Sequence, residues 1–343
     1  MNFLRSHMNS LKMRTEMLLG AQFSFQEMTR GLYGLTAPEY PEEMFADVLD
    51  ELNQVLPGKG SLLERVESFR QKMVVPSNKL AATMTSAVEA FHDIAVERMG
   101  ITKDSAPRLS FYGFGPHRKG LELDGYVYDW EWDRINWEIV FSTDHAFAID
   151  DIISFSCHEV EPGHLTFIGL RTKAAYENGC PELAVIAQFN ESSAFIEGAA
   201  RMSIDLCLPG EELFAFERDL LFPLAGIDKG LAECLPAWHK FRKATNFAKL
   251  VLERNRWDGK WSKEEGIAWM KQYMLAPPQD CAALVDHLAA DPGHFVAHDY
   301  SREVITNYVY DKEPTWEGRW KLYRELSMAH ISMRAIEDRS FQL

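Results

Sequence analysis

Two histidines six residues apart set the strictest condition on how this chain folds. They begin and end the segment His158-Glu159-Val160-Glu161-Pro162-Gly163-His164. Residues four apart share a face of an α-helix, whereas residues six apart point roughly 240° away from each other around its axis. The two imidazoles can meet only if the helix is interrupted between them. Pro162 removes a backbone donor and Gly163 tolerates distorted dihedral angles, so a bulge here is expected to bring His164 back to the face of His158.

The sequence after this segment predicts two helices. Residues 165–176 have a helical pattern, and Asn178-Gly179 is a typical end for it. Pro181 is expected to be the first position of a second helix, because proline fits the first turn. That second helix should run to about Leu206.

A carboxylate on the second helix can complete a metal site. Antiparallel packing of the two helices would bring Glu197 alongside His158. Glu191 lies on the same predicted helix and is a competing candidate. Glu197 is favoured because Gly198 beside it allows a neighbouring backbone or a metal to approach closely, although the same glycine can serve helix packing.

The predicted site is one divalent metal ion, expected to be zinc, held by His158, His164 and Glu197. Two histidines and a glutamate are a ligand set of catalytic zinc, with a position left for water. Glu159 would take the proton of that water as it attacks a peptide or a small-molecule amide. The same ligands also describe the facial triad of iron enzymes. An iron or manganese lyase, isomerase or oxygenase acting on a small metabolite is therefore the alternative.

Other histidines and a cysteine are further ligand candidates. Cys157 adjoins the first ligand and could be a soft ligand, although a small buried thiol is the commoner role. His145 is a lone histidine in a predicted loop, where a surface or hydrogen-bonding role is more frequent. His294 and His298 are four apart and share a predicted helical face, which raises a second metal-site hypothesis. Because no glutamate follows His294, a structural or substrate-orienting role is preferred for this pair.

The histidine segment resembles the HExxPGHH motif of a large bacterial family of zinc-peptidase-like proteins. That family is catalogued as a domain of unknown function, and its helical architecture is similar to that of thermostable metallocarboxypeptidases. Residues 195–200, Phe-Ile-Glu-Gly-Ala-Ala, echo the F-x-EGWALY phrase that follows the motif in the family. Further segments resemble family phrases in the same order, namely residues 20–25, 56–62 and 261–267. The resemblance covers most of the chain and implies a helical, zincin-like body with the same three ligands and the same base.

Two departures from the family pattern lie beside the predicted ligands. Leu165 stands where the family has the second histidine of PGHH, and residues 199–202 replace the bulky Trp-Ala-Leu-Tyr. These changes bear on substrate specificity. The loss of the second histidine also leaves a third reading open, in which the helical body is retained as a binding module without catalysis.

Candidates for stabilising an oxyanion lie near the C-terminus. Residues 292–298 resemble a family segment that reads PGQ-x-x-x-Y, and His298 stands at the position of the tyrosine. The resemblance therefore makes His298 the first candidate for donating a hydrogen bond to the oxyanion. Tyr300 is the second candidate, because tyrosine is the residue type that the family pattern places in this role, and Arg302 is a further candidate.

The predicted fold is mainly α with a small antiparallel β-sheet around residues 108–142. Tyr126, Tyr128, Trp130 and Trp132 recur at alternate positions, which is the period of a strand. An edge of such a sheet could bind extended peptide, although core packing is the commoner role for these aromatics. Helices are predicted elsewhere, over residues 2–32, 40–56, 61–73, 76–99, 231–256, 262–275, 294–310 and 315–343. No repeat or linker interrupts the pattern, so residues 1–343 are treated as one domain.

Charge and cysteine usage exclude several classes of partner. The 51 acidic and 36 basic residues give a net charge of −15, which argues against nucleic acid or an anionic membrane as a partner. No apolar run reaches the roughly 18 residues that cross a bilayer. The five scattered cysteines form no CxxC pair, which is typical of a reducing compartment. A cytoplasmic protein acting on a short peptide or small amide is expected, and the sequence leaves a homodimer open.

Overall fold

The computed structural model describes residues 2–112, 123–131, 134–143 and 145–341, with only the backbone given for residues 123–131 and 134–138. Its architecture is mainly α, as the sequence predicts. The α-helices are α1 (Asn2–Leu18), α2 (Phe25–Tyr33), α3 (Glu42–Val55), α4 (Leu62–Met73), α5 (Ser77–Met99), α6 (Ile149–Ser154), α7 (His164–Glu177), α8 (Glu191–Cys207), α9 (Glu211–Phe216), α10 (Phe222–Ala225), α11 (Leu235–Trp257), α12 (Lys263–Trp269), α13 (Pro278–Ala290), α14 (Ser301–Lys312), α15 (Trp316–Met328) and α16 (Met333–Glu337).

Short π-helical and 3₁₀ segments interrupt or join these helices. The π-helical segments are η3 (Phe155–Val160), η5 (Glu217–Leu221), η7 (Met270–Met274) and η8 (Val296–Tyr300). The 3₁₀ segments are η1 (Lys103–Ser105), η4 (Pro181–Ala184) and η6 (Lys229–Cys234). Two of the π-helical segments, η3 and η8, carry histidines predicted for the site. Wide π turns are frequent at functional positions because they redirect the side chains that they carry.

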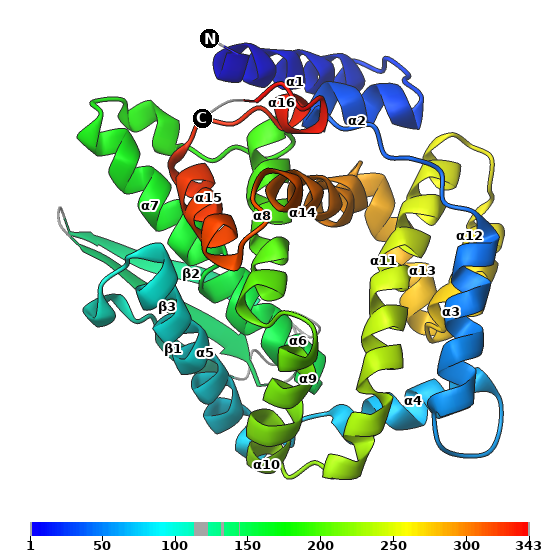
Figure 1. Ribbon diagram of the computed structural model, residues 1–343. Coiled ribbons are helices and arrows are strands. Elements are labelled where there is room, and N and C mark those ends of the chain that lie inside the picture. Colours follow the sequence, from blue (N-terminus) through cyan, green and yellow to red (C-terminus); the bar gives the residue numbers. More distant parts are fainter. Residues whose placement is uncertain (1, 113–122, 132–133, 144, 342–343) are drawn as a thin grey trace.

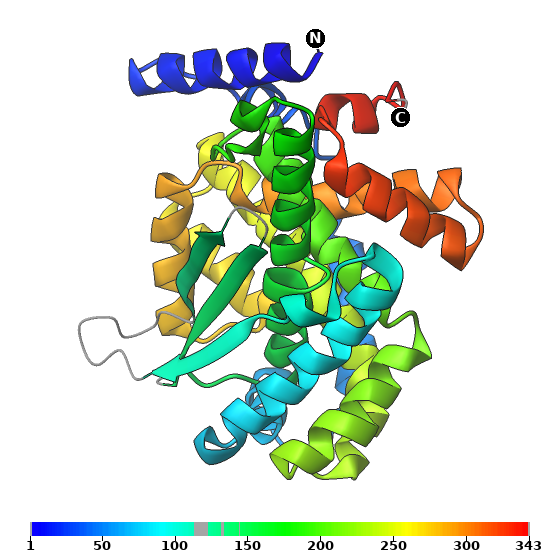
Figure 2. The same ribbon diagram turned by 90° about the vertical axis from the view of Figure 1, so that its left-hand side faces the viewer.

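Helix α8 runs through the middle of the molecule (Figure 1). The sheet, α5 and α7 lie on one side of it, and α11 with α3 lies on the other. Helix α8 contacts α14, α7, η3 and η8. In Figure 2 the sheet is on the viewer's side of the molecule, beside α5 and α7, while α1 and α16 are both at the end where the two termini lie. None of the helices in the described part of the chain has both the length and the apolar character to span a membrane.

Serine caps begin two helices at the residues where the sequence predicts a helix to start. Ser61 and Ser262 each accept a hydrogen bond from the backbone of a glutamate three residues later, and that glutamate bonds back to the serine. These reciprocal bonds satisfy backbone donors that a helix leaves unpaired in its first turn. Pro236 lies in the first turn of α11 and opens that helix rather than kinking it.

Three predicted helices are broken in the structure. The predicted helix over residues 2–32 ends at Leu18, and α2 begins after Ser24, which forms a capping box that favours a new start over continuation. Pro181 begins only the 3₁₀ segment η4, and α8 starts later because Asn190 accepts hydrogen bonds from the backbone of its first turn. The predicted helix over residues 315–343 is divided into α15 and α16.

The small sheet lies in the predicted region but is mixed rather than antiparallel. Strands β1 (Arg108–Tyr112), β2 (Leu123–Glu131) and β3 (Arg134–Ser142) lie in the order β1-β3-β2. Strand β2 pairs with β3 in the antiparallel direction, whereas β1 pairs with β3 in parallel. Parallel pairing sets Phe111 beside the buried Phe141, and their rings stack with centroids 5.6 Å apart. The backbone confirms the strand period of residues 123–131, while their side chains and Trp132 lie outside the described part.

An aromatic cluster joins the sheet to the segment that carries the first histidine. Phe141 on β3 contacts Phe147 and Phe155 edge to face, and the latter two contact each other with centroids 5.4 Å apart. Phe155 is the first residue of η3. Edge-to-face aromatic pairs stabilise beyond the area that they bury, so the sheet fixes the start of η3.

Candidate metal centre

His158 and His164 lie on separate helical segments. His158 is a buried residue of η3, in which the backbone N–H of Glu161 bonds to the carbonyl of Ser156, five residues earlier. The chain leaves the helix at Glu161 and re-enters one at His164, the first residue of α7. The six-residue spacing is thus accommodated by a π turn followed by a break, rather than by a bulge within one helix.

Gly163 allows the two segments to approach each other. A Cβ added at Gly163 would lie 2.6 Å from the carbonyl carbon of His158 and closer still to the carbonyl oxygens of His158 and Cys157. Carbon atoms in contact are about 3.5–4.0 Å apart, so no larger residue fits without moving the backbone. The close approach of the main chain therefore requires glycine at this position.

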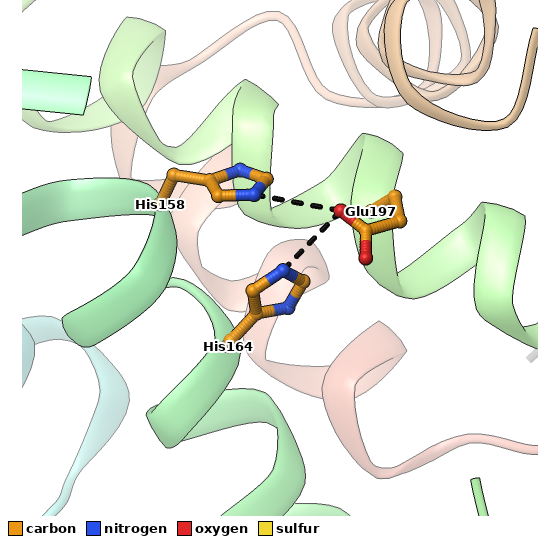
Figure 3. A group of neighbouring side chains, drawn as sticks. All are labelled: His158, His164 and Glu197. Atoms are coloured by element: carbon orange, nitrogen blue, oxygen red, sulfur yellow. Dashed lines mark ion pairs between the residues drawn. The ribbon is translucent and has the colours of Figure 1, made fainter. Parts of the chain in front are cut away.

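The three predicted ligands converge. The Nε2 atoms of His158 and His164 lie 3.4 and 3.3 Å from Oε2 of Glu197, as Figure 3 shows. The ligand atoms of these three residues all lie within 4.8 Å of one another. Glu197 projects from α8, and both rings turn toward it from η3 and from the start of α7. The structure therefore contains a His/His/Glu group that could hold a metal ion.

Gly198 brings another element close to the ligand helix. A Cβ at Gly198 would lie 2.6 Å from the carbonyl carbon of Ser301 and 2.8 Å from the amide nitrogen of Arg302. The backbone at the start of α14 therefore packs directly on α8. Gly198 thus serves the packing of one helix on another, the role that the sequence analysis gave as the alternative.

The group combines an ionised carboxylate with buried imidazoles. Burial alone would raise the pKa of Glu197, but the charge of His164 and hydrogen bonds from both histidines hold it well below its ordinary value of 4.5. Burial lowers the pKa of His158, which Glu159 offsets only in part. For His164, burial is outweighed by Glu197, so the pKa is raised.

The donor set fits a divalent transition metal. Two imidazole nitrogens and one carboxylate oxygen are the ligands of many catalytic zinc sites, and three protein ligands leave coordination positions for other groups. Nδ1 of His158 is buried and has no hydrogen-bond partner among the residues that the structure describes. Glu159 and Glu197 face the ring on its Nε2 side. Iron and manganese accept the same set of ligands.

Glu159 lies at the edge of this group. Its Oε1 is 3.5 Å from Nε2 of His158, and its Oε2 is 4.0 Å from Nε2 of His164. Its side chain is 21% exposed, comparable to Glu197 at 22%. A carboxylate that is close to the ligands and still reached by solvent is in position to exchange a proton with a bound molecule.

His298 contacts the predicted ligand Glu197 from another direction. Its Nε2 lies 3.2 Å from Oε2 of Glu197, and its Nδ1 lies 2.8 Å from the carbonyl oxygen of His294. Because a carbonyl only accepts, Nδ1 carries the proton in this contact. Burial lowers the pKa of His298 to about 4, against the opposing charge of Glu197. The ring is therefore neutral near pH 7 and presents a lone pair to Glu197.

The other two oxyanion candidates are engaged elsewhere. The hydroxyl of Tyr300 donates to Oε1 of Glu337 on α16 at 3.2 Å. The guanidinium of Arg302 forms a forked pair with Asp205, with Nη2 to Oδ1 at 2.7 Å. Neither contact reaches the His/His/Glu group, and an oxyanion-binding role for these residues stays a prediction.

The competing ligand candidates have other partners. Glu191 is buried and accepts hydrogen bonds from the hydroxyl of Ser332 at 2.5 Å and from the backbone of Arg334 at 3.1 Å, so it ties α8 to α16. The thiol of Cys157 lies 3.1 Å from the hydroxyl of Ser203. The ring of His145 packs on a phenylalanine of the aromatic cluster. The sequence-based preference for Glu197 over Glu191 agrees with this geometry.

Two residues that the sequence did not single out hold the turn between the histidines. The buried His92 on α5 has its Nδ1 2.5 Å from Oε2 of Glu161, and its Nε2 contacts the carbonyl of Lys103. The hydroxyl of Tyr323 on α15 lies 3.2 Å from the carbonyl of Pro162 and 3.1 Å from that of Ala199 on α8. These partners are distant in sequence, so no local pattern could have identified them.

Comparisons with known proteins show a fold neighbour and no family. No family of proteins and no curated protein matches this chain. Among solved structures, the chain is similar to "the putative lipoprotein from Colwellia psychrerythraea", with a TM-score of 0.64 and 15% sequence identity. The match covers 92% of this chain and 54% of that protein, so this chain spans about half of its length. At this identity the likeness shows the fold alone.

Proposed function

We propose that this protein is a metal-dependent hydrolase, with zinc as the metal, that cleaves an amide bond in a short peptide or a small molecule. The observation that carries the proposal is the convergence of His158, His164 and Glu197, with the carboxylate of Glu159 beside them. The helical body and the resemblance of the motif to the zinc-peptidase-like family support it. The proposal includes membership of that family and its zincin-like character.

The roles of the side chains follow from their positions. When bound, zinc polarises a carbonyl and lowers the pKa of water toward neutrality. His158 and His164 offer their Nε2 atoms as ligands, and Glu197 offers an ionised oxygen. Glu159 would take the proton that the attacking water loses and pass it to the amine nitrogen that leaves as the C–N bond breaks. Its two oxygens lie 3.5 and 4.0 Å from the histidine nitrogens, at the edge of the group.

His298 supports a cation at this place and orients Glu197. With its proton directed at a carbonyl, the neutral ring presents Nε2 to the carboxylate oxygen of Glu197 at 3.2 Å. Two acceptor atoms this close attract each other only when a cation or a proton lies near both. In the proposed site, zinc supplies that positive charge.

A polar pocket beside α8 supports a short, extended substrate. Glu197, Arg201 and Asp205 are four residues apart and share one face of α8, and Asp205 lines a pocket of about 280 Å³. Eight residues of helix span about 12 Å, which is the length of three to four extended residues. The pocket is lined by Asp205, Lys243, Asn246, Phe247, Asp299, Arg302, Glu303, Thr306 and Asn307. A peptide with its scissile bond at Glu197 could extend into this pocket.

The test compares Glu159→Gln with the parent protein and with the matched control Glu177→Gln, which lies exposed at the end of α7. Metal content is measured by elemental analysis, and turnover is measured on a set of dipeptides to tetrapeptides and amino-acid anilides. Glu159→Gln should retain the metal and lose about 100-fold or more in turnover, the usual contribution of a general base. The control Glu177→Gln should match the parent in metal content and in turnover.

Two results would overturn the proposal. One is turnover by Glu159→Gln at the parent rate, which would remove the base. The other is no hydrolysis of any member of the set by the zinc-loaded parent. Stoichiometric iron in protein purified without added metal, together with an oxygen-dependent activity, would favour the non-hydrolytic alternative.

A further inference from the structure

A second group of metal-ligating side chains lies at the turn that joins α13 to η8. His287 is in the last turn of α13, Asp291 follows that helix, and His294 begins the next helical segment. One ligand atom from each of the three residues lies within 4.8 Å of the others. None of the three belongs to the His158/His164/Glu197 group. The short spacing, H-x3-D-x2-H, lets one turn present all three side chains on the same side.

The separations of these atoms are close to those of a metal complex. Nδ1 of His294 lies 2.7 Å from Oδ2 of Asp291, and Nε2 of His287 lies 3.9 Å from the same oxygen. Zinc bonds to nitrogen and oxygen are about 2.0–2.2 Å long, which places two ligands of a tetrahedral site about 3.3 Å apart. The distance from His294 to Asp291 is shorter than this separation, and the distance from His287 to Asp291 is longer. His287 is 51% exposed, so its ring is able to make the small adjustment that binding requires.

The turn that presents the group is held firmly from the inside. Gly293 has φ +79°, and a Cβ there would lie 2.5 Å from the ring of Tyr33. The hydroxyl of Tyr33 donates to the carbonyl of Pro292 at 2.9 Å. The buried carboxyl group of Glu253 accepts from the backbone N–H of Phe295 at 3.3 Å. Ligands on a preformed turn lose little conformational freedom on binding, which favours affinity.

The group is also connected to the first metal group. The rings of His294 and His298 are stacked, with centroids 4.0 Å apart and an interplanar angle of 22°. Their ligand atoms point to different partners, Asp291 for His294 and Glu197 for His298. The pair is therefore divided between two groups and does not form a metal site by itself, which differs from the hypothesis that the sequence raised.

We propose that His287, Asp291 and His294 form a second binding site for a divalent transition metal. The metal takes the place of the proton between Nδ1 of His294 and the carboxylate, and His287 supplies the third ligand. Two imidazoles and one carboxylate select zinc, cobalt, nickel or copper over magnesium and calcium, which prefer oxygen ligands. Because His287 is half exposed, metal at this outer site exchanges more readily than metal at His158/His164/Glu197.

The proposal predicts two metal ions per chain, and it predicts that each single substitution affects only one of the two sites. Equilibrium dialysis against Zn²⁺, with elemental analysis and with Co²⁺ absorption as a second readout, should give two ions per parent chain. His287→Ala and Asp291→Asn should each weaken one of the two sites by at least about tenfold, since loss of even a supporting partner costs that much. Glu197→Ala should lose the other site and retain this one. His330→Ala, at an exposed histidine outside both groups, is the matched control and should bind two.

The outcomes separate this proposal from the proposed function. One ion in Glu197→Ala that is lost on adding His287→Ala supports the outer site, whatever the enzymatic result. Parent-like binding of two ions by both His287→Ala and Asp291→Asn overturns the outer site. The outer site is also overturned if the parent binds one ion and Glu197→Ala binds none. Urea unfolding of each variant confirms that it is folded before its metal content is counted.

Discussion

The turn between the two histidines can be tested by one added methyl group, with the substitution Gly163→Ala. The new Cβ would lie 2.6 Å from the carbonyl carbon of His158, so the two segments must separate by about 1 Å or more to reach contact distance. Metal–ligand distances hold to about 0.2 Å, and the separation exceeds that several-fold. Overpacking costs about 1–3 kcal/mol where side chains can yield. Here the obstacle is backbone, so we expect the upper end of that range and about 100-fold weaker zinc binding.

A control at the other end of the same helix isolates the effect. Gly179 has φ +69° with open space around its Cβ position, so Gly179→Ala should cost about 1–2 kcal/mol and leave zinc binding unchanged. Unfolding is followed in urea, and zinc affinity by competition with a chromogenic chelator. If Gly163→Ala does not fold, Tyr323→Phe removes the two hydroxyl contacts to the turn and to α8, and it should weaken zinc binding with a smaller loss of stability. Parent-like zinc affinity in a folded Gly163→Ala variant, or in Tyr323→Phe where Gly163→Ala does not fold, would refute the reasoning.

Two further predictions concern buried carboxyl groups. Glu191→Ala should lower the free energy of unfolding by about 1–3 kcal/mol, because it leaves the donors of Ser332 and Arg334 unpaired. The zinc stoichiometry, measured by elemental analysis, should stay at the parent value. Loss of zinc would show that the wrong glutamate was assigned. Burial raises the pKa of Glu253 from 4.5 to about 8, against the backbone hydrogen bonds that lower it. Between these values the folded chain holds a proton that the unfolded chain has released, so the contribution to stability is full below about pH 4.5 and is lost as pH rises to about 8, by at most about 1.4 kcal/mol per pH unit. Glu253→Gln imitates the protonated acid and should reduce this slope in urea unfolding measured from pH 5 to 8; equal slopes in the variant and the parent would contradict the assignment.

Helix starts were predictable where a local hydrogen-bond pattern marks them. The predicted helices over residues 61–73 and 262–275 begin at the serines that cap α4 and α12, and each serine forms a capping box with the glutamate three residues later. The same pattern, Ser24 with Glu27, marks the true start of α2. Apolar residues continue through this capping box, so the helical pattern alone predicts one uninterrupted helix over residues 2–32. A capping box is therefore a better guide to a helix boundary than a continuous helical pattern.

The metal group was predictable because its chemistry is restrictive. Few residue types bind zinc, and the spacing of His158 and His164 demanded a break that the sequence between them could supply. The path of that break was not predictable. It depends on a π turn, on carbonyl groups that approach Gly163, and on His92 and Tyr323, which lie far away in the sequence. Contacts of this kind leave no periodic signal.

The same distant contacts would link binding of a metal at His158, His164 and Glu197 to the stability of the whole fold. The ligands lie on three segments, and the turn between the first two is held by α5 through His92 and by α15 through Tyr323. The unfolded chain has no such arrangement, so a metal that binds the folded state alone stabilises it by about 2.7 kcal/mol at one hundred times its dissociation constant. Zinc should therefore raise the unfolding midpoint of the parent. It should do so much less in Glu197→Ala, where only the outer group remains to bind it.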